Sequence, residues 1–133
     1  HSWANVFTGC SSLKSITVPE GVTTLCAYVF SGANYLEEVI LPESLKTIGG
    51  SAFAGCVRLK SIEIPDSVTE IRSGAFNGCT GLTSIDFPAS LIVIGSRAFY
   101  GCTGLTSMNF QVPMTASRAF VSAVFFSDRP NTW

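Results

Sequence analysis

Four cysteines recur at one regular spacing, and thiols are the side chains that soft metals and redox chemistry use. Cys10, Cys56, Cys79 and Cys102 occupy one position of a regular lattice, and Cys26 stands apart from it. Stacked repeats would put neighbouring members about 5 Å apart, near disulfide range. A zinc site, however, needs four ligands that converge on one point, and free cysteine is among the most buried residue types. The row therefore predicts buried structural thiols, with no metal site and no cofactor.

Carboxylates recur in the same manner. Glu63 and Asp86 are separated by the same interval as Cys56 and Cys79, and stacking would make them adjacent like charges that could hold a cation. A second column contains Glu20, Glu43 and Asp66, and three stacked carboxylates could attract Ca²⁺. That column lacks the asparagine and glycine ligands of a dedicated calcium loop, so a plain acidic turn edge is the favoured interpretation.

The sequence offers no set of groups for catalysis. His1 is the single histidine and stands at the terminus, which excludes a histidine-based triad. Phosphate loops and dinucleotide motifs are absent from the sequence. A net charge of −1 supplies no basic field for nucleic acid, and no apolar run approaches the length of a membrane helix. We therefore expect a protein that is not an enzyme, with no catalytic residue, no nucleic-acid partner and no membrane insertion.

A strict internal repeat must position these side chains. Phenylalanine recurs with a fixed period of twenty-three, at Phe7, Phe30, Phe53, Phe76 and Phe99. Glycine follows each of them by two residues, and leucine, isoleucine or valine, and proline recur in the same register. A fixed period of this length is the signature of a solenoid, in which each repeat forms one coil and buries its core only against its neighbours.

Each part of one repeat has a structural interpretation. Ile62 and Ile64 have the period of two that is typical of a strand with one face inward. Pro65 has no N–H for a ladder and ends the strand, and the segment 68–71 predicts a second short extended stretch. Residues 75–79 predict a tight helical or 3₁₀ turn, with glycine where a side chain would strain the backbone. The fold class is thus a solenoid of about five coils, with parallel β-strands and short 3₁₀ or helical turns.

Side chains that alternate with the buried strand positions should line one face of the sheet. We interpret this face as the candidate partner-binding site, and a merely solvated face is the alternative. Its ten residues are Ser15, Thr17, Glu38, Ile40, Ser61, Glu63, Ser84, Asp86, Ser107 and Asn109. Beside them Lys14, Glu37 and Lys60 alternate in sign, which predicts a lateral row of ion pairs.

The repeat resembles a known family. The pattern Leu-x-x-Ile-x-Ile-Pro, then Val-x-x-Ile-Gly-x-x-Ala-Phe-x-Gly-Cys, is similar to the BspA-like leucine-rich repeat, and residues 59–79 and 82–102 match it best. The resemblance covers about residues 4–110, and Ala33 in place of cysteine is one departure. It implies a curved solenoid with parallel strands on its concave side. It also implies cell-surface or secreted proteins of bacteria and some protozoa, many of them adhesins.

The two ends of the chain differ from the middle. The chain opens inside a repeat, as a processed product or a piece of a longer protein would, and Trp3 could cover the exposed Phe7. We assign residues 1–120 to the solenoid and residues 121–133 to a C-terminal cap or an irregular tail.

Two functions follow as hypotheses. The first is a non-catalytic solenoid that binds a protein or glycan ligand, as part of a cell-surface or secreted adhesin-like protein. The alternative is a structural spacer, or an element that assembles end to end through the open ends of the solenoid. Light scattering against concentration separates them, because a monomer at high concentration argues against assembly through the ends.

Overall fold

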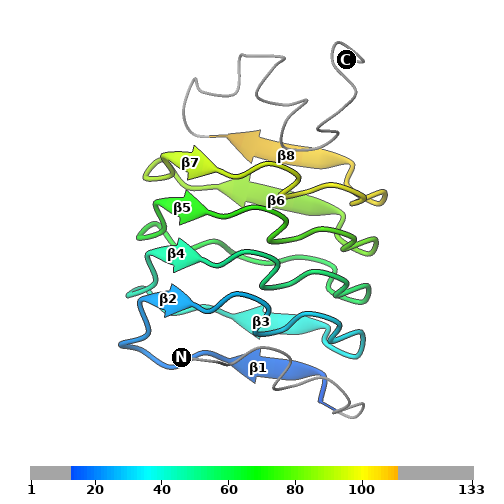
Figure 1. The fold of residues 1–133 in the computed structure, drawn as a ribbon, viewed down its shortest axis with the longest axis horizontal. Coiled ribbons are helices and arrows are strands. Elements are labelled where there is room, and N and C mark those ends of the chain that lie inside the picture. Colours follow the sequence, from blue (N-terminus) through cyan, green and yellow to red (C-terminus); the bar gives the residue numbers. More distant parts are fainter. Residues whose placement is uncertain (1–12, 111–133) are drawn as a thin grey trace.

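The computed structural model describes residues 13–110, which form a stack of parallel coils (Figure 1). Each coil runs once around the stack and lies directly on the previous one. No helix occurs in this part of the chain, so none of the described residues forms a membrane-spanning helix. The repeat predicted by the sequence is therefore confirmed as a solenoid whose coils are built from short strands and turns.

Within residues 13–110, eight short strands lie on two sides of the stack. One side carries β1 (Ser15–Thr17), β3 (Glu38–Ile40), β6 (Ser84–Phe87) and β8 (Ser107–Phe110). We call it the strand face. The other side carries a four-stranded sheet of β2 (Thr24–Leu25), β4 (Thr47–Ile48), β5 (Glu70–Ile71) and β7 (Val93–Ile94). All pairs are parallel, and the second sheet confirms the extended stretch that the segment 68–71 predicts.

The register of the strands is the repeat period itself. Ser15 pairs with Glu38 and Thr24 pairs with Thr47, so that each residue lies beside its equivalent in the next repeat. A shift by one residue would turn every inward side chain outward, because side chains alternate along a strand. The register therefore keeps each buried position above the same position of the next coil.

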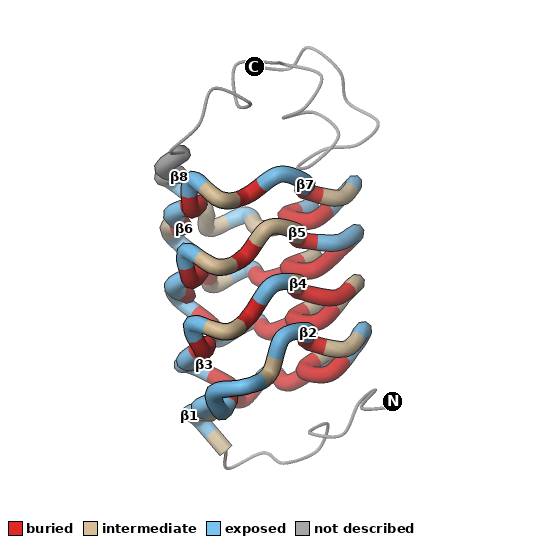
Figure 2. Tube along the Cα trace, turned by 90° about the vertical axis from the view of Figure 1, so that its left-hand side faces the viewer, coloured by how far each residue is buried: buried red, intermediate tan, exposed pale blue. Residues whose placement is uncertain are grey.

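Buried residues recur at corresponding places in successive coils (Figure 2), and together they form one hydrophobic core. Phe53 and Phe76 are fully buried, and their ring centroids lie 5.1 Å apart with an interplanar angle of 8°. The same stacking joins Phe30 to Phe53 at 5.3 Å and Phe76 to Phe99 at 5.1 Å. This spacing is close to the separation of hydrogen-bonded strands, so one ring fits each coil without distortion of the stack.

The tight turn of residues 74–79 alternates between two kinds of hydrogen bond. The N–H groups of Ala75, Asn77 and Cys79 bond within the turn, to the carbonyl three residues earlier. Those of Phe76 and Gly78 donate to carbonyls of the next coil, at 2.7 and 2.8 Å. Every second N–H is thus used between coils, which explains why the expected turn forms without a 3₁₀ helix. Gly78 has a φ of +78°, as predicted for a position where a side chain would strain the backbone.

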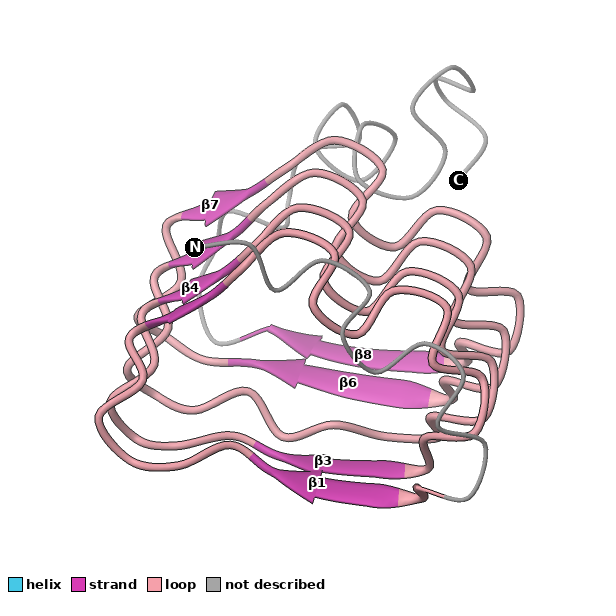
Figure 3. Ribbon diagram, turned by 60° about the horizontal axis from the view of Figure 1, so that its bottom comes forward, coloured by secondary structure: helices cyan, strands magenta, loops and turns pink. Residues whose placement is uncertain are grey.

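One step of the strand face is not hydrogen-bonded in the regular way (Figure 3). Lys14 O accepts from the N–H groups of Glu37 and Glu38, and Lys60 O accepts from Thr83 N. Among the described residues, no backbone hydrogen bond joins segments 37–41 and 60–64. The strand expected at residues 62–64 therefore reduces to one isolated bridge, between Glu63 and Asp86. We call the interval between segments 37–41 and 60–64 the open step.

Several sequence predictions fall outside residues 13–110. They concern the packing of Trp3 on Phe7, the thiol of Cys10, and the assignment of residues 121–133 to a cap or a tail. The boundary at residue 120 stays a prediction for the same reason.

Candidate functional site

The strand face holds the predicted binding residues together. Ser15 and Thr17 on β1 pair with Glu38 and Ile40 on β3, and all four side chains are exposed. Ser61, Glu63 and Asp86 are also exposed, and Ser84 is half-buried. Ser107 and Asn109 on β8 pair with Ser84 and Asp86 through the backbone, and their side chains lie outside the described set. The face is therefore assembled as the alternation predicts, and its binding role stays a prediction.

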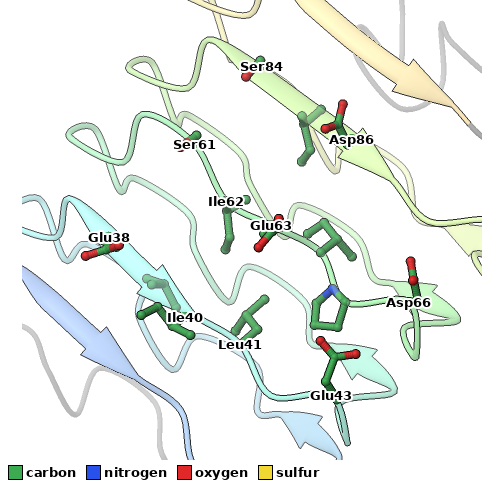
Figure 4. A pocket seen from close by; sticks show the side chains of 14 residues that line it. Glu38, Ile40, Leu41, Glu43, Ser61, Ile62, Glu63, Asp66, Ser84 and Asp86 are labelled. Atoms are coloured by element: carbon green, nitrogen blue, oxygen red, sulfur yellow. The ribbon is translucent and has the colours of Figure 1, made fainter.

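A pocket of about 560 Å³ lies over the open step (Figure 4). Its lining comes from three successive coils and from the turns that follow their strands. The exposed side chains among the lining residues include Glu38, Ile40, Glu43, Ser61, Glu63, Asp66 and Asp86. We call this pocket the acidic groove. Six of the ten predicted face residues line it, and Ser15, Thr17, Ser107 and Asn109 do not.

Charge is the dominant property of the acidic groove. Five of its lining residues are carboxylates, and none is lysine, arginine or histidine. The groove thus carries a formal charge of −5, whereas the whole chain carries −1. Ile40 adds an apolar side chain that is 49% exposed. An acidic surface with one apolar contact point is suited to a positively charged ligand.

The carboxylates of the groove have no ion-pair partner within the described part of the chain. An ion pair there joins Arg72 Nε to Glu70 Oε2 at 3.1 Å, and it lies on the opposite sheet. The predicted row of ion pairs through Lys14, Glu37 and Lys60 is therefore wrong. The segments of Glu37 and Lys60 lack a backbone ladder across the open step, and Lys14 and Glu37 form no ion pair although their segments are hydrogen-bonded.

The column of Glu20, Glu43 and Asp66 has a structural role in the turns. The carboxylate of Glu20 accepts a hydrogen bond from Glu43 N at 3.0 Å, so it links one coil to the next. In residues 13–110, no three histidine, cysteine or acidic side chains converge in a way that could hold a metal ion. The hydrogen bond from Glu43 N gives Glu20 a structural role at the turn edge.

The members of the cysteine row that the structure describes, Cys56, Cys79 and Cys102, are free thiols. The thiols of Cys56 and Cys79 are fully buried and donate to Phe30 O at 3.3 Å and to Phe53 O at 3.1 Å. Cys102, which is half-buried, donates to Phe76 O at 3.1 Å. Burial raises the pKa of Cys56 to about 12 and that of Cys102 to about 11. Burial, reinforced by the flanking thiols, raises the pKa of Cys79 further.

These thiols therefore act as hydrogen-bonded core residues. A nucleophilic or metal-binding cysteine must be available as the thiolate, and the raised pKa values keep the row protonated at neutral pH.

Glu43 and Asp66 belong to the acidic groove, although the repeat spacing puts them in a different column from Glu63 and Asp86. Each follows a proline at the end of its segment of the strand face, Pro42 or Pro65, so the groove extends around the end of that face. The signal was present in the spacing, since Glu43 comes three residues after Ile40 and Asp66 three after Glu63. The open step had no counterpart in the sequence pattern.

Known proteins resemble this chain in sequence and in structure. The family described as BspA type leucine rich repeat region matches residues 3–126 in six copies. No curated protein matches the chain.

Solved structures of other leucine-rich repeat proteins are similar to this chain. A leucine-rich repeat protein from Bacteroides ovatus is 36% identical over 79% of the chain, with a TM-score of 0.69. The pneumococcal vaccine antigen PcpA is 29% identical over 74% of the chain, with a TM-score of 0.72. A leucine rich cell surface protein from Faecalibacterium prausnitzii is 30% identical over 89% of the chain, with a TM-score of 0.59. The chain spans only 33%, 24% and 36% of these three proteins, respectively.

Proposed function

The chain belongs to the BspA-type leucine-rich repeat family, and on this premise we propose that it is a non-catalytic binding module. Its ligand is a protein or a glycan that docks on the strand face. The parent protein is located at the cell surface or secreted, and acts as an adhesin. Two relatives support the surface location, because one is a vaccine antigen and another a cell surface protein.

The observation that carries the proposal is that the inward and outward positions of each coil differ in burial and in variability. Inward positions such as Leu59, Ile62 and Phe76 are buried in the core. The outward positions of the strand face vary between coils, from Ile40 to Glu63 to Asp86, and remain exposed. Side chains that vary and have no part in the core are free to contact another molecule.

Binding can be tested with a charge reversal on the strand face. The double variant Glu63→Arg with Asp86→Arg is compared with wild type on arrays of secreted proteins and of glycans. We expect wild type to bind at least one array component, and the variant to lose that component. Both residues are exposed, so the thermal midpoint should change little.

A matched control separates location from net charge. Glu37→Arg with Glu70→Arg makes the same charge change at two residues that do not line the acidic groove. This control variant should still bind the array component that wild type binds. Equal binding by wild type and by the strand-face variant would refute the site assignment.

A further inference from the structure

We propose that the acidic groove binds an extended, lysine- or arginine-rich segment of a protein partner. This inference rests on the proposed function and names the chemistry of the partner. The open step provides the place, and the unbalanced charge of the groove provides the selectivity.

The first argument is the distribution of the charge. Glu38, Glu63 and Asp86 extend across three coils, and Glu43 and Asp66 continue the acidic surface at the turn end (Figure 4). The five carboxylates are spread out, and the described residues hold no converging set for a metal ion. A ligand that matches them must carry several positive charges at separate points. A peptide with several lysines or arginines does so, whereas one small cation cannot.

The second argument is the backbone of the open step. In the regular pattern, Val18 N donates to Ile40 O at 2.9 Å and Thr83 N donates to Lys60 O at 3.0 Å. The equivalent bonds from Leu41 N to Glu63 O and from Lys60 N to Glu37 O are missing between the described segments. The acidic groove thus lies over a step of the strand face that lacks the regular ladder between coils. An extended peptide can place its side chains along this surface at the spacing of a strand.

The third argument is the apolar contact. Ile40 is the exposed large apolar side chain among the lining residues, on β3 beside the open step. Peptides that contact a sheet face gain specificity from alternate side chains. A basic segment with one aliphatic residue would therefore match both the carboxylates and Ile40. Nucleic acid and acidic glycans carry the wrong charge, because like charges across an interface oppose binding.

The test uses fluorescence anisotropy with a labelled peptide of about ten residues in which lysine and threonine alternate, since alternate residues of a strand share one face. The comparison peptide replaces every lysine by glutamate. We expect the lysine peptide to bind wild type and the glutamate peptide not to bind. The affinity should fall as NaCl rises from about 50 to about 300 mM, because exposed charges are screened.

The variant Glu63→Gln with Asp86→Asn should weaken the lysine peptide by about fivefold or more, through the loss of two charge contacts. The matched variant Glu37→Gln with Glu70→Gln removes the same charge outside the groove, and its affinity should stay within about twofold of wild type. Equal weakening by both variants would show unspecific attraction and overturn the proposal. So would spermine that binds as tightly as the peptide, because charge alone would then explain the affinity.

The outcome is distinguishable from a failure of the proposed function. If array components require the strand face but the lysine peptide does not bind, the binding module stands and the basic partner is refuted. If the lysine peptide binds the groove with the expected variant pattern but the arrays yield nothing, the inference stands and the array-based support is lost.

Discussion

Replacing Phe76 by alanine should destabilise the whole stack severely. Its ring is fully buried and lies between Phe53 and Phe99, both at 5.1 Å. Removal of a buried phenylalanine costs about 3–5 kcal/mol, and each stacked pair contributes about 0.5–1.5 kcal/mol beyond its burial. The flanking turns are fixed by hydrogen bonds between coils, such as Phe53 N to Ala75 O at 2.7 Å. The cavity therefore cannot collapse, and we expect a loss of about 4–5 kcal/mol.

Urea denaturation followed by circular dichroism measures this loss. Domains commonly have only about 5–15 kcal/mol of stability, so the variant should be close to unfolding at room temperature. Tyr100→Ala is the control, because Tyr100 is also an aromatic residue of a turn but its side chain is 40% exposed. This substitution should lower the free energy of unfolding by less than about 1 kcal/mol. A loss below about 2 kcal/mol for Phe76→Ala, or one equal to the control, would refute the description of the phenylalanine column as a rigid core.

Three further predictions concern the backbone and the thiols. Ser51 has a φ of 55°, so Ser51→Gly should raise the free energy of unfolding by about 0.5–1 kcal/mol, and a lower thermal midpoint would contradict this. Burial raises the pKa of Cys56 to about 12 from 9.0, and raises that of Cys79 as well, so the native state keeps protons that the unfolded chain releases. Their contribution to stability is complete below the unfolded pKa of 9.0, and should then fall by about 1.4 kcal/mol per pH unit for each thiol until the native thiols titrate. The double variant Cys56→Ala with Cys79→Ala should show a shallower alkaline loss in urea midpoints between about pH 8 and about pH 10.5, whereas equal slopes would count against these pKa shifts. Under native conditions a thiol reagent should modify Cys26, which is half-buried, faster than Cys56 and Cys79, and mass spectrometry of peptides would detect the opposite order.

The periodic part of the fold could be predicted because each coil repeats one set of buried positions. The column of Phe30, Phe53, Phe76 and Phe99, the strand alternation and the glycine with positive φ all follow from one register. Burial and backbone geometry at these positions are determined within one coil or by the equivalent residue of the next coil. One sequence therefore shows the same requirement several times.

The parts of the fold that the repeat pattern does not predict depend on contacts between neighbouring coils of different sequence. The sequence predicts a strand at residues 62–64 as strongly as elsewhere, yet the open step leaves it without a ladder to β3. Pairing depends on the fit between two coils, which no single repeat specifies. The positive φ of Tyr28, Ser51 and Arg97 was also missed. The sequence feature that indicates this positive φ is Gly74, which occupies the same repeat position and has a φ of +67°.

The candidate face was predictable as a set of outward positions, and the acidic groove was not. Alternation alone places Glu38, Glu63 and Asp86 on one side of the strands. Glu43 and Asp66 join them because the chain bends at the proline corner, and the direction of that bend is a property of the folded coil.

Hydrogen bonds between coils join residues that lie about one repeat apart in the sequence, such as Ser90 Oγ to Val68 O and Cys79 Sγ to Phe53 O. A duplication or deletion of one whole repeat unit keeps the register of the coils, so that the hydrogen bonds that recur between successive turns, such as Phe53 N to Ala75 O and Phe76 N to Ala98 O, can form again. Insertion of a few residues within a coil would break them all at that level. Such a gene can therefore lengthen or shorten its product in complete units, and a new coil brings new outward side chains without any change to the core.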